Sequence, residues 1–293
     1  MADVSLVIPS RRGGPSLVET VAAFAQEGGA ALEIVVPECV PDGSAARIME
    51  RWPAVRVLHF TEPRTIPELR AAGLDAATAP IVAMTADACA PAPGWLEALR
   101  RAHAAGADAV GGAVENGSTA RLIDWAVFFC EYGRFMAPLA PAPADDLPGQ
   151  NVSYVRAALA PIADLIRQGT WEPLWHWQLA ERGARLTRDG TRVVILTKRY
   201  TFTGFVRERF AFGRSFAAQR TAGAAAVTRA LYAAGCVALP VVVLFRLGRD
   251  LLPKRRCYGR LLSSVPYLIA FACVWAAGEA VGYLAGAGAN TVD

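Results

Sequence analysis

The chain has 293 residues, 54% of them hydrophobic, and a formal net charge of +4. This length can hold one sizeable domain with a smaller appendage. The six cysteines form no C-x-x-C pair and the three histidines are scattered, so the composition excludes a zinc site and a disulfide framework and is typical of free thiols in a reducing compartment.

The first 80 residues alternate short apolar runs with helical patterns. Strands are expected at 4–9, 33–36 and 55–60, and helices at 16–26 and 67–77. This alternation predicts an open α/β sheet.

Asp87 follows a short apolar run, residues 80–84, that is typical of a strand buried on both faces. Two prolines and a glycine at 91–94 are expected to end this strand in proline-rich turns, and a helix is expected from Trp95. A carboxylate at the carboxyl edge of an open α/β sheet is well placed to bind a metal or a phosphate. A strand end with a solvated aspartate fits the same spacing, so both interpretations stay open.

Two later segments precede the C-terminal region. Residues 136–148 are rich in Ala and Pro and are expected to form no regular element, so they are either disordered or functional. Thr170 is expected to cap a helix over 171–182 that ends at Gly183. Glu172 lies in the first turn of this helix, where the dipole favours an ionised carboxylate that can accept a proton. Glutamate is also common there for helix stability alone.

Two stretches near the C-terminus, 230–245 and 261–278, carry no charge. Each approaches the ~20 apolar residues that span a bilayer, and their apolar character all round favours a membrane over a buried core. Basic residues precede the first stretch or lie between the two: Arg207, Arg209, Arg214, Arg220, Arg229, Arg246, Arg249, Lys254, Arg255, Arg256 and Arg260. Such clusters attract anionic head groups and lipid-linked phosphates, and they lack the recognition motifs of nucleic-acid-binding proteins, so no nucleic acid is expected as a partner.

The path of these stretches has two interpretations. In a hairpin both stretches cross, and the basic interval 246–260 lies outside, against the positive-inside tendency. Pro240 lies midway along the first stretch and can break it into a re-entrant turn, so that the interval stays cytoplasmic and only the second stretch crosses. The re-entrant path is favoured and the hairpin stays open. Because the first strand follows the start directly, the N-terminal domain is expected on the cytoplasmic side of the cytoplasmic (inner) membrane.

Several separated motifs resemble those of family 2 glycosyltransferases. Residues 84–99, MTADACAPAPGWLEAL, resemble the family's metal-binding segment T-E-D-D-C-x-P-x-P-G-W-L, and residues 67–77 resemble its L-R-N-x-G helix, with Arg70 and Gly73 kept. Similar matches are QNVSYVR at 150–156, the W-E of 171–172, and RERFAFGR at 207–214. The resemblance implies a GT-A (Rossmann-like nucleotide-diphospho-sugar transferase) domain over 1–205. A basic, aromatic interfacial segment at 206–229 and two hydrophobic membrane helices within 230–289 would follow.

The resemblance also implies roles for single residues. Donor binding would involve Pro9, Ser10, Arg11, Glu38, Arg70, Asp87, Arg209 and Arg214. Asp87 would also bind one Mg²⁺ or Mn²⁺, Glu172 would be the catalytic base, and Asn151 and Trp171 would lie on the acceptor side. Asp145 and Asp146 are rival bases, in a segment that would form a mobile lid. The sequence departs from the family at Ala86 and Ala88, which replace further acidic residues, and at Glu38, which replaces an aspartate.

These residue types suit glycosyl transfer from a nucleotide diphosphate. The leaving diphosphate must be neutralised, which a divalent cation on Asp87 can do, and the acceptor hydroxyl must lose a proton, which Glu172 can accept. The predicted function is a membrane-anchored inverting glycosyltransferase with a lipid-linked or membrane-proximal acceptor. The alternative is a catalytically inactive GT-A-like membrane scaffold. A sugar nucleotidyltransferase is disfavoured because residues 9–14 do not fit its G-x-G-[TS]-R loop.

Overall fold

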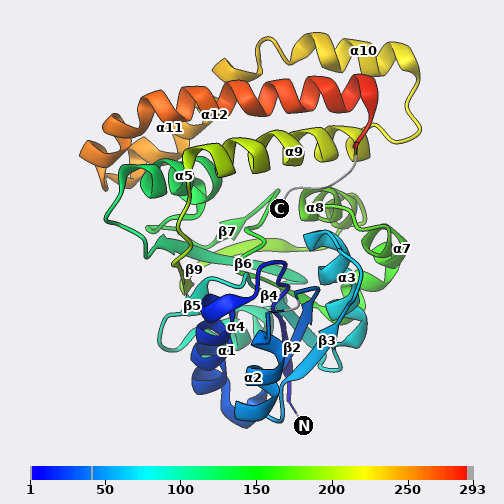
Figure 1. Ribbon diagram of the computed structural model, residues 1–293, viewed down its shortest axis with the longest axis vertical. Helices are drawn as coiled ribbons and strands as arrows, with labels where there is room; N and C mark the ends of the chain where they lie inside the picture. The colour runs from blue at the N-terminus through cyan, green and yellow to red at the C-terminus, as the bar shows by residue number, and fades with distance from the viewer. Residues whose placement is uncertain (1, 41, 289–293) are drawn as a thin grey trace. The chain divides into compact units, whose positions relative to one another are not determined.

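The structure is a computed structural model that describes residues 2–40 and 42–288, and it divides into two compact units. The first unit comprises Met1–Glu115 and Phe135–Thr197, and the second comprises Asn116–Arg134 and Lys198–Asp293. The second unit therefore takes a helix from the middle of the chain as well as the C-terminal region. Figure 1 shows the elements of both units in chain order.

A mixed sheet is the centre of the first unit. Its strands are β1 (Val4–Val7), β2 (Leu32–Glu38), β3 (Arg56–His59), β4 (Ile81–Met84), β5 (Cys89–Pro91), β6 (Ala109–Asn116), β7 (Ala142–Pro143), β8 (Val152–Val155) and β9 (Leu186–Leu196). The order is β3-β2-β1-β4-β8-β6-β9-β5, and β7 pairs with β9. The first four strands are parallel to one another, whereas β8 is antiparallel to β4 and to β6. The predicted α/β fold is thus confirmed, with an antiparallel half that the sequence pattern did not indicate.

The first unit contains the helices α1 (Gly14–Gly28), α2 (Ser44–Arg51), α3 (Ile66–Ala76), α4 (Trp95–Ala104), α6 (Arg156–Leu159), α7 (Ala163–Arg167) and α8 (Glu172–Glu181). Of these, α1, α2 and α3 connect the four parallel strands. The start of α3 is fixed by a reciprocal capping box between Thr65 and Glu68. Gly73 lets α3 approach the sheet, since an added Cβ would lie 2.3 Å from Val7 Cγ1. Arg70, on the same helix, is buried in the protein interior.

Two expectations about proline-rich segments are wrong. Cys89–Pro91 form strand β5, which pairs with β9 at the end of the sheet, and a proline is tolerated on an edge strand because no neighbour needs its missing N–H. The Ala/Pro-rich segment 136–148 contains strand β7, and the backbone N–H of Ala144 donates to Leu186 O at 3.0 Å. Both segments are held by β9, which the sequence analysis did not predict.

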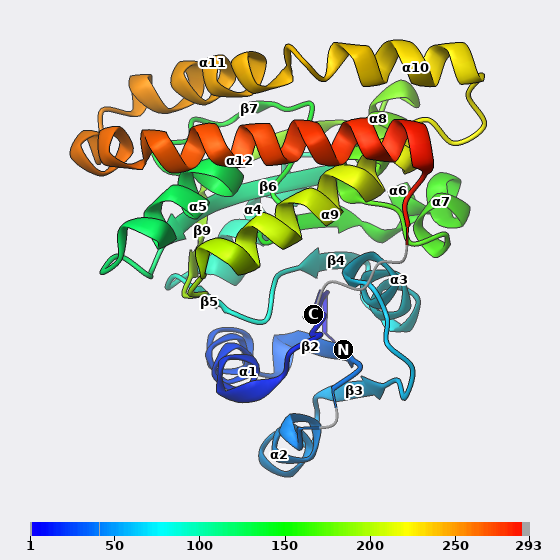
Figure 2. The same cartoon turned by 45° about the horizontal axis from the view of Figure 1, so that its top comes forward.

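The second unit is helical. It contains α5 (Leu122–Tyr132), α9 (Phe202–Arg220), α10 (Ala226–Gly235), α11 (Leu239–Leu251) and α12 (Tyr258–Ala285). The last helix contacts the other four, and Figure 2 shows it between α9 on one side and α10 with α11 on the other. Glycine allows the close approach of α9 and α12, because a Cβ added at Gly278 would lie 2.4 Å from Phe210 O.

Only α12, within the part of the chain that the structure describes, is long and apolar enough to cross a membrane as one helix. The first apolar stretch is broken: Ala226–Gly235 and Leu239–Lys254 meet at an angle of 60°. Pro240 lies in the first turn of α11, where its ring and missing N–H are tolerated. The predicted break near Pro240 is confirmed, and the path of both stretches relative to a membrane stays a prediction.

Candidate functional site

Three loops of the first unit meet at the carboxyl ends of its parallel strands. Ser10, after β1, donates a hydrogen bond from its hydroxyl to Asp87 Oδ2, after β4, at 2.6 Å. The backbone of Ser10 also bridges to that of Glu38, the last residue of β2. Pro9 and Ser10 are buried and Arg11 is half-buried in the same loop. Residues predicted from separate motifs are thus brought to the edge at which open α/β sheets bind their ligands.

Asp42 fixes two of these loops to each other. Its carboxylate accepts hydrogen bonds from the backbone N–H of Gly14 at 2.5 Å and of Ser44 at 2.9 Å. Burial alone would raise the pKa of Asp42, but the hydrogen bonds from Ser44 and Gly14 outweigh it and hold the pKa below its usual value. Gly13, at φ 59°, leaves room for this carboxylate, since a Cβ there would lie 2.6 Å from an Asp42 oxygen. The sequence analysis missed Asp42, although its Asp-Gly-Ser turn was a usable signal.

Glu38 is buried, with 1% of its surface exposed. Its carboxylate lies 2.5 Å from His59 Nδ1 and accepts a hydrogen bond from the backbone N–H of Val40 at 2.6 Å. The longer side chain that replaces the family's aspartate therefore reaches the next strand, β3. Its donor-binding role remains a prediction.

Asp87 is half-buried and is the candidate metal ligand. No group of three or more His, Cys, Asp or Glu side chains in the described residues could hold a metal ion by itself. Asp87 and the Ser10 hydroxyl offer oxygen donors, which Mg²⁺ and Mn²⁺ prefer, and such ions complete their coordination with phosphate and water. The residues present therefore fit a cation that protein and diphosphate hold jointly.

Glu172 forms a buried ion pair with Arg70, between α8 and α3. The two side chains are 4% and 3% exposed, and Arg70 Nη2 also donates to Gly149 O at 3.4 Å. Thr170 does not cap α8 as predicted. Its hydroxyl donates to Leu165 O at 2.8 Å and accepts from Trp175 Nε1 at 2.9 Å, and Trp171, which is half-buried, occupies the N-cap position without a side-chain cap.

The segment 149–151 connects the Asp87 loop with this ion pair. Thr85 donates from its hydroxyl to Gln150 O at 2.9 Å, and Gly149 contacts Arg70. The Asn151 side chain is buried: it accepts from Trp95 Nε1 at 3.0 Å and donates to Ala113 O and Arg192 O. The Asn151 side chain thus links Trp95 of α4 with strands β6 and β9 in the interior. Its acceptor-side role remains a prediction.

A second buried network of hydrogen bonds is centred on His176 of α8. His176, fully buried, binds the Tyr154 hydroxyl through Nε2 at 2.9 Å and Asp146 Oδ1 through Nδ1 at 2.7 Å. Burial raises the pKa of Tyr154, which stays neutral. Asp146, the rival base, therefore anchors the segment 136–148 to α8. A separation of 30 residues between Asp146 and His176 gave no sequence signal for this contact.

Arg192 organises the antiparallel half of the sheet. It is fully buried and donates to Ser153 Oγ and Val110 O at 2.5 Å and to Asn151 O at 2.9 Å. Burial lowers the pKa of Arg192 to about 9. His103, whose Nε2 lies 2.7 Å from Ser153 Oγ, has a pKa lowered to about 4, first by burial and further by the charge of Arg192.

We expect His103 to make the folded protein sensitive to mild acid. An unfolded histidine binds a proton near pH 6.5, whereas folded His103 stays neutral down to about 4, so stability is complete above pH 6.5 and falls as the pH drops from 6.5 to 4. The loss approaches about 3 kcal/mol at 1.36 kcal/mol per pKa unit. The melting temperature in detergent, measured between pH 7.5 and 4.5, should decline less in His103→Gln. An equal decline in both proteins would contradict this assignment.

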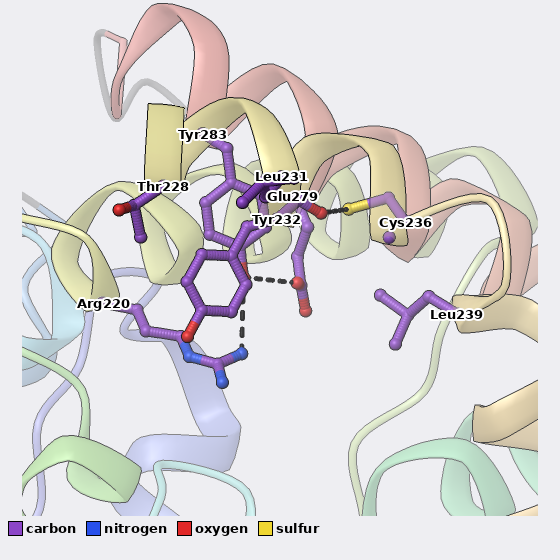
Figure 3. Close-up of a pocket in the computed structure, with 9 residues that line it drawn as sticks. Arg220, Thr228, Leu231, Tyr232, Cys236, Leu239, Glu279 and Tyr283 are labelled. Atoms are coloured by element: carbon purple, nitrogen blue, oxygen red, sulfur yellow. Dashed lines mark hydrogen bonds between the residues drawn. The ribbon is translucent and has the colours of Figure 1, made fainter. Parts of the chain in front are cut away.

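Arg209 and Arg214 belong to the second unit. Arg209 Nη1 donates to Glu131 Oε1 at 2.5 Å and its guanidinium lies 4.1 Å from the centre of the Trp275 ring, while Arg214 Nε donates to Gly286 O at 2.8 Å. Their donor-binding roles remain predictions. The second unit also contains a cavity of about 490 Å³, lined in part by Arg220, Tyr232, Glu279 and Tyr283 (Figure 3).

Comparison with known proteins relates part of the chain to one family. The model of glycosyl transferase family 2 matches residues 5–139, and no protein of curated function matches the chain. Among solved structures, the mannosyltransferase PcManGT from Pyrobaculum calidifontis, in complex with GDP-Man and Mn²⁺, is 19% identical with a TM-score of 0.55, over 92% of this chain and 86% of its own.

Residues 1–349 of TarS from S. aureus are 13% identical, with a TM-score of 0.51 over 73% of this chain. Their complex with UDP-GlcNAc gives the same identity and TM-score. The chain spans 64% of the length of this TarS fragment. These similarities show a shared GT-A fold, and within it residues 5–139 match the model of glycosyl transferase family 2.

Proposed function

We propose that the protein transfers a sugar from a nucleoside diphosphate donor to a lipid-linked or membrane-proximal acceptor, with inversion at the anomeric carbon. The observation that carries this proposal is the cluster at the carboxyl edge of the parallel strands. There Ser10 binds Asp87, and the segment 149–151 connects Asp87's loop with the Arg70–Glu172 pair. A candidate diphosphate site and a candidate base therefore belong to one connected site.

The reaction step follows from these groups. The acceptor hydroxyl oxygen forms a bond to the anomeric carbon while the bond from that carbon to the diphosphate oxygen breaks. Glu172 takes the hydroxyl proton, and the nucleoside diphosphate leaves with the bonding electron pair. Direct displacement by one base inverts the configuration. When bound, a divalent cation at Asp87 neutralises the charge that develops on the diphosphate.

Arg70 is the residue that can couple the donor to the base. Its Nε is buried with no hydrogen-bond partner in the structure as described, and a buried donor without an acceptor is costly. A diphosphate oxygen could supply the missing acceptor. If Arg70 turns toward the diphosphate, it frees Glu172 to accept a proton.

The same ion pair also favours the alternative function. A buried carboxylate held by arginine can be purely structural, and Ala86 and Ala88 leave Asp87 without acidic neighbours in sequence. A GT-A-like scaffold without catalysis would show these features. The two functions differ in whether a nucleotide sugar binds.

Thermal stabilisation of the purified full chain by nucleotide sugars tests the proposal. UDP- and GDP-sugars are screened with and without Mn²⁺. A ligand at 100 times its Kd stabilises by about 2.7 kcal/mol. We expect one class of donor to raise the melting temperature, more strongly with Mn²⁺. No shift with any nucleotide sugar would favour the scaffold.

Membrane association is part of the proposal, and it rests on the apolar α12, the bent pair α10 and α11, and the basic residues around them. We infer the cytoplasmic face of the cytoplasmic membrane, because basic residues are retained on that side and attract its anionic lipids. The acceptor would then be a lipid or a lipid-linked molecule.

Replacing Gly149 with alanine is expected to lower turnover by about 10-fold, since small misplacements of a catalytic group are costly. The new Cβ would lie 3.1 Å from Arg70 Nη2 and 3.3 Å from Glu172 Oε2, so one of these groups must shift. Gly259→Ala is the control, because a Cβ there meets nothing within 4 Å. Initial rates are compared at saturating donor. Wild-type rates in Gly149→Ala, or equal losses in both variants, would contradict the assignment.

A further inference from the structure

One face of α12 is exposed and uncharged along the helix. Its members recur mostly every three or four residues: Leu262, Val265, Ile269, Cys273, Ala277 and Leu284. This spacing gives a single stripe on a helix, which is the signature of a surface that contacts an apolar medium. The exposed side chains of α10, α11 and the turn between them are also largely apolar, with Val227, Leu231, Val237, Val241 and Phe245 among them.

The opposite side of α12 is joined to α9 along most of its length. The two helices run in the same direction. The Phe205 ring packs 4.6 Å from the Phe271 ring, the Arg209 guanidinium lies on Trp275, and Arg214 binds Gly286 O. Their backbones touch: a Cβ added at Gly282 would lie 2.2 Å from Arg214 O. Because the two helices are packed together, α9 must follow the same path as α12 in a membrane.

Charged residues of the second unit lie at the level of the middle of α12. These contacts place Phe205 and Arg209 beside Phe271 and Trp275, which lie in the central turns of α12. Arg209 pairs there with Glu131 of α5. Glu208 pairs with Lys198 at 3.5 Å, and Arg207 is exposed. If α12 crossed a bilayer, these groups would lie near its centre, where charged side chains are strongly disfavoured.

Basic residues lie at both ends of α12, those at its C-terminal end coming from α9 and α10. At the C-terminal end, Arg229 donates to Tyr283 O at 2.6 Å and to Leu284 O at 3.1 Å. Figure 3 shows Arg220 beside Tyr283, whose hydroxyl accepts from Arg220 Nη1 at 3.4 Å and donates to Glu279 at 2.9 Å. Exposed arginines precede or begin the N-terminal end: Arg255, Arg256 and Arg260. Basic residues at both ends suit the head-group level of one leaflet.

We propose that α12 lies parallel to the membrane surface, and that α10, α11 and α12 form a layer within one leaflet of an anionic phospholipid membrane. The uncharged stripe of α12 contacts the acyl chains, and α9 with its charges lies on the side of α12 away from the stripe. Helices that bind in this way have an apolar face and basic flanks. The inference rests on the membrane association included in the proposed function. It replaces the hairpin and the re-entrant path, in both of which α12 crosses the membrane, with a path in which α12 does not cross.

Cysteine labelling on the two sides of a membrane tests this path. One variant keeps Cys257, before α12, and has the other five cysteines replaced by serine. The other replaces all six and carries Ala287→Cys, after α12. Each is expressed as the full chain, and right-side-out and inside-out membrane vesicles are treated with a membrane-impermeant maleimide. Detergent-solubilised protein gives the full labelling of each position.

The two positions should label in the same vesicle orientation and be protected in the other. Both the hairpin and the re-entrant path require α12 to cross, so either predicts labelling from opposite faces. Opposite-face labelling, or protection of position 287 in the orientation that labels Cys257, would overturn the in-plane path and leave membrane association intact. Recovery of the wild-type chain in the soluble fraction would instead overturn the membrane association and the in-plane path with it.

Discussion

Glu172→Gln should lower sugar transfer by about 10² to 10⁴-fold, the usual effect of removing a general base. Glutamine keeps the shape of the side chain and can still accept from Arg70, but it cannot take the proton of the acceptor hydroxyl. Donor binding should persist, because the diphosphate site at Ser10 and Asp87 is unchanged. Initial rates and donor-induced shifts of the melting temperature, measured on the same preparation, separate the two effects.

The matched control for this variant is Glu181→Gln, an exposed carboxylate at the other end of α8. It should transfer sugar at the wild-type rate. Because Glu172 neutralises the buried Arg70, Glu172→Gln also leaves an unpaired charge and should melt at a lower temperature. Wild-type transfer by Glu172→Gln would move the base to Asp145 or Asp146, of which Asp146 is already bound to His176.

Asp87→Asn should weaken Mn²⁺-dependent donor binding by at least about 100-fold, since losing a residue that only supports a metal ligand already costs 10 to 100-fold. Asparagine can still accept from the Ser10 hydroxyl, so the loop should keep its conformation. The missing group is the negative charge that holds the cation. Calorimetric titration of the nucleotide sugar, with and without Mn²⁺, measures the change.

Glu97→Gln serves as the control for Asp87→Asn. Glu97 is exposed on α4 and pairs only loosely with Arg101, at 3.7 Å. Its replacement should leave the Mn²⁺-dependent affinity unchanged. The same affinity in Asp87→Asn as in the wild type would remove Asp87 from the site and favour the scaffold.

Local signals in the sequence predicted the parallel half of the sheet. Apolar runs, helical patterns and glycine or proline punctuation are short-range features, so strands such as β1 and β4 and helix α3 were predicted within a few residues. The same signals located Asp87 at the end of a strand. They failed at β5, where pairing with a distant edge partner overrode the proline preference.

Contacts between distant residues were beyond these signals. Arg70 and Glu172 are 102 residues apart, and each was identified from its own motif without any indication that they form a pair. Arg192 was missed altogether, because its role comes from three strands that meet around one buried guanidinium. In the same way, composition predicted a membrane helix at 261–278, within α12, but could not show that α9 lies against it with charged residues at mid-length.

The central claim is that one site binds a nucleotide sugar and transfers its sugar. Release of nucleoside diphosphate by the purified full chain, measured with each nucleotide sugar, a membrane lipid extract and Mn²⁺, tests it most directly. The account predicts release with at least one donor, which rises when the extract is present and is lost on chelation of the metal and in Glu172→Gln. No release above background with any donor would contradict it, and equal release by wild type and Glu172→Gln would remove Glu172 as the base.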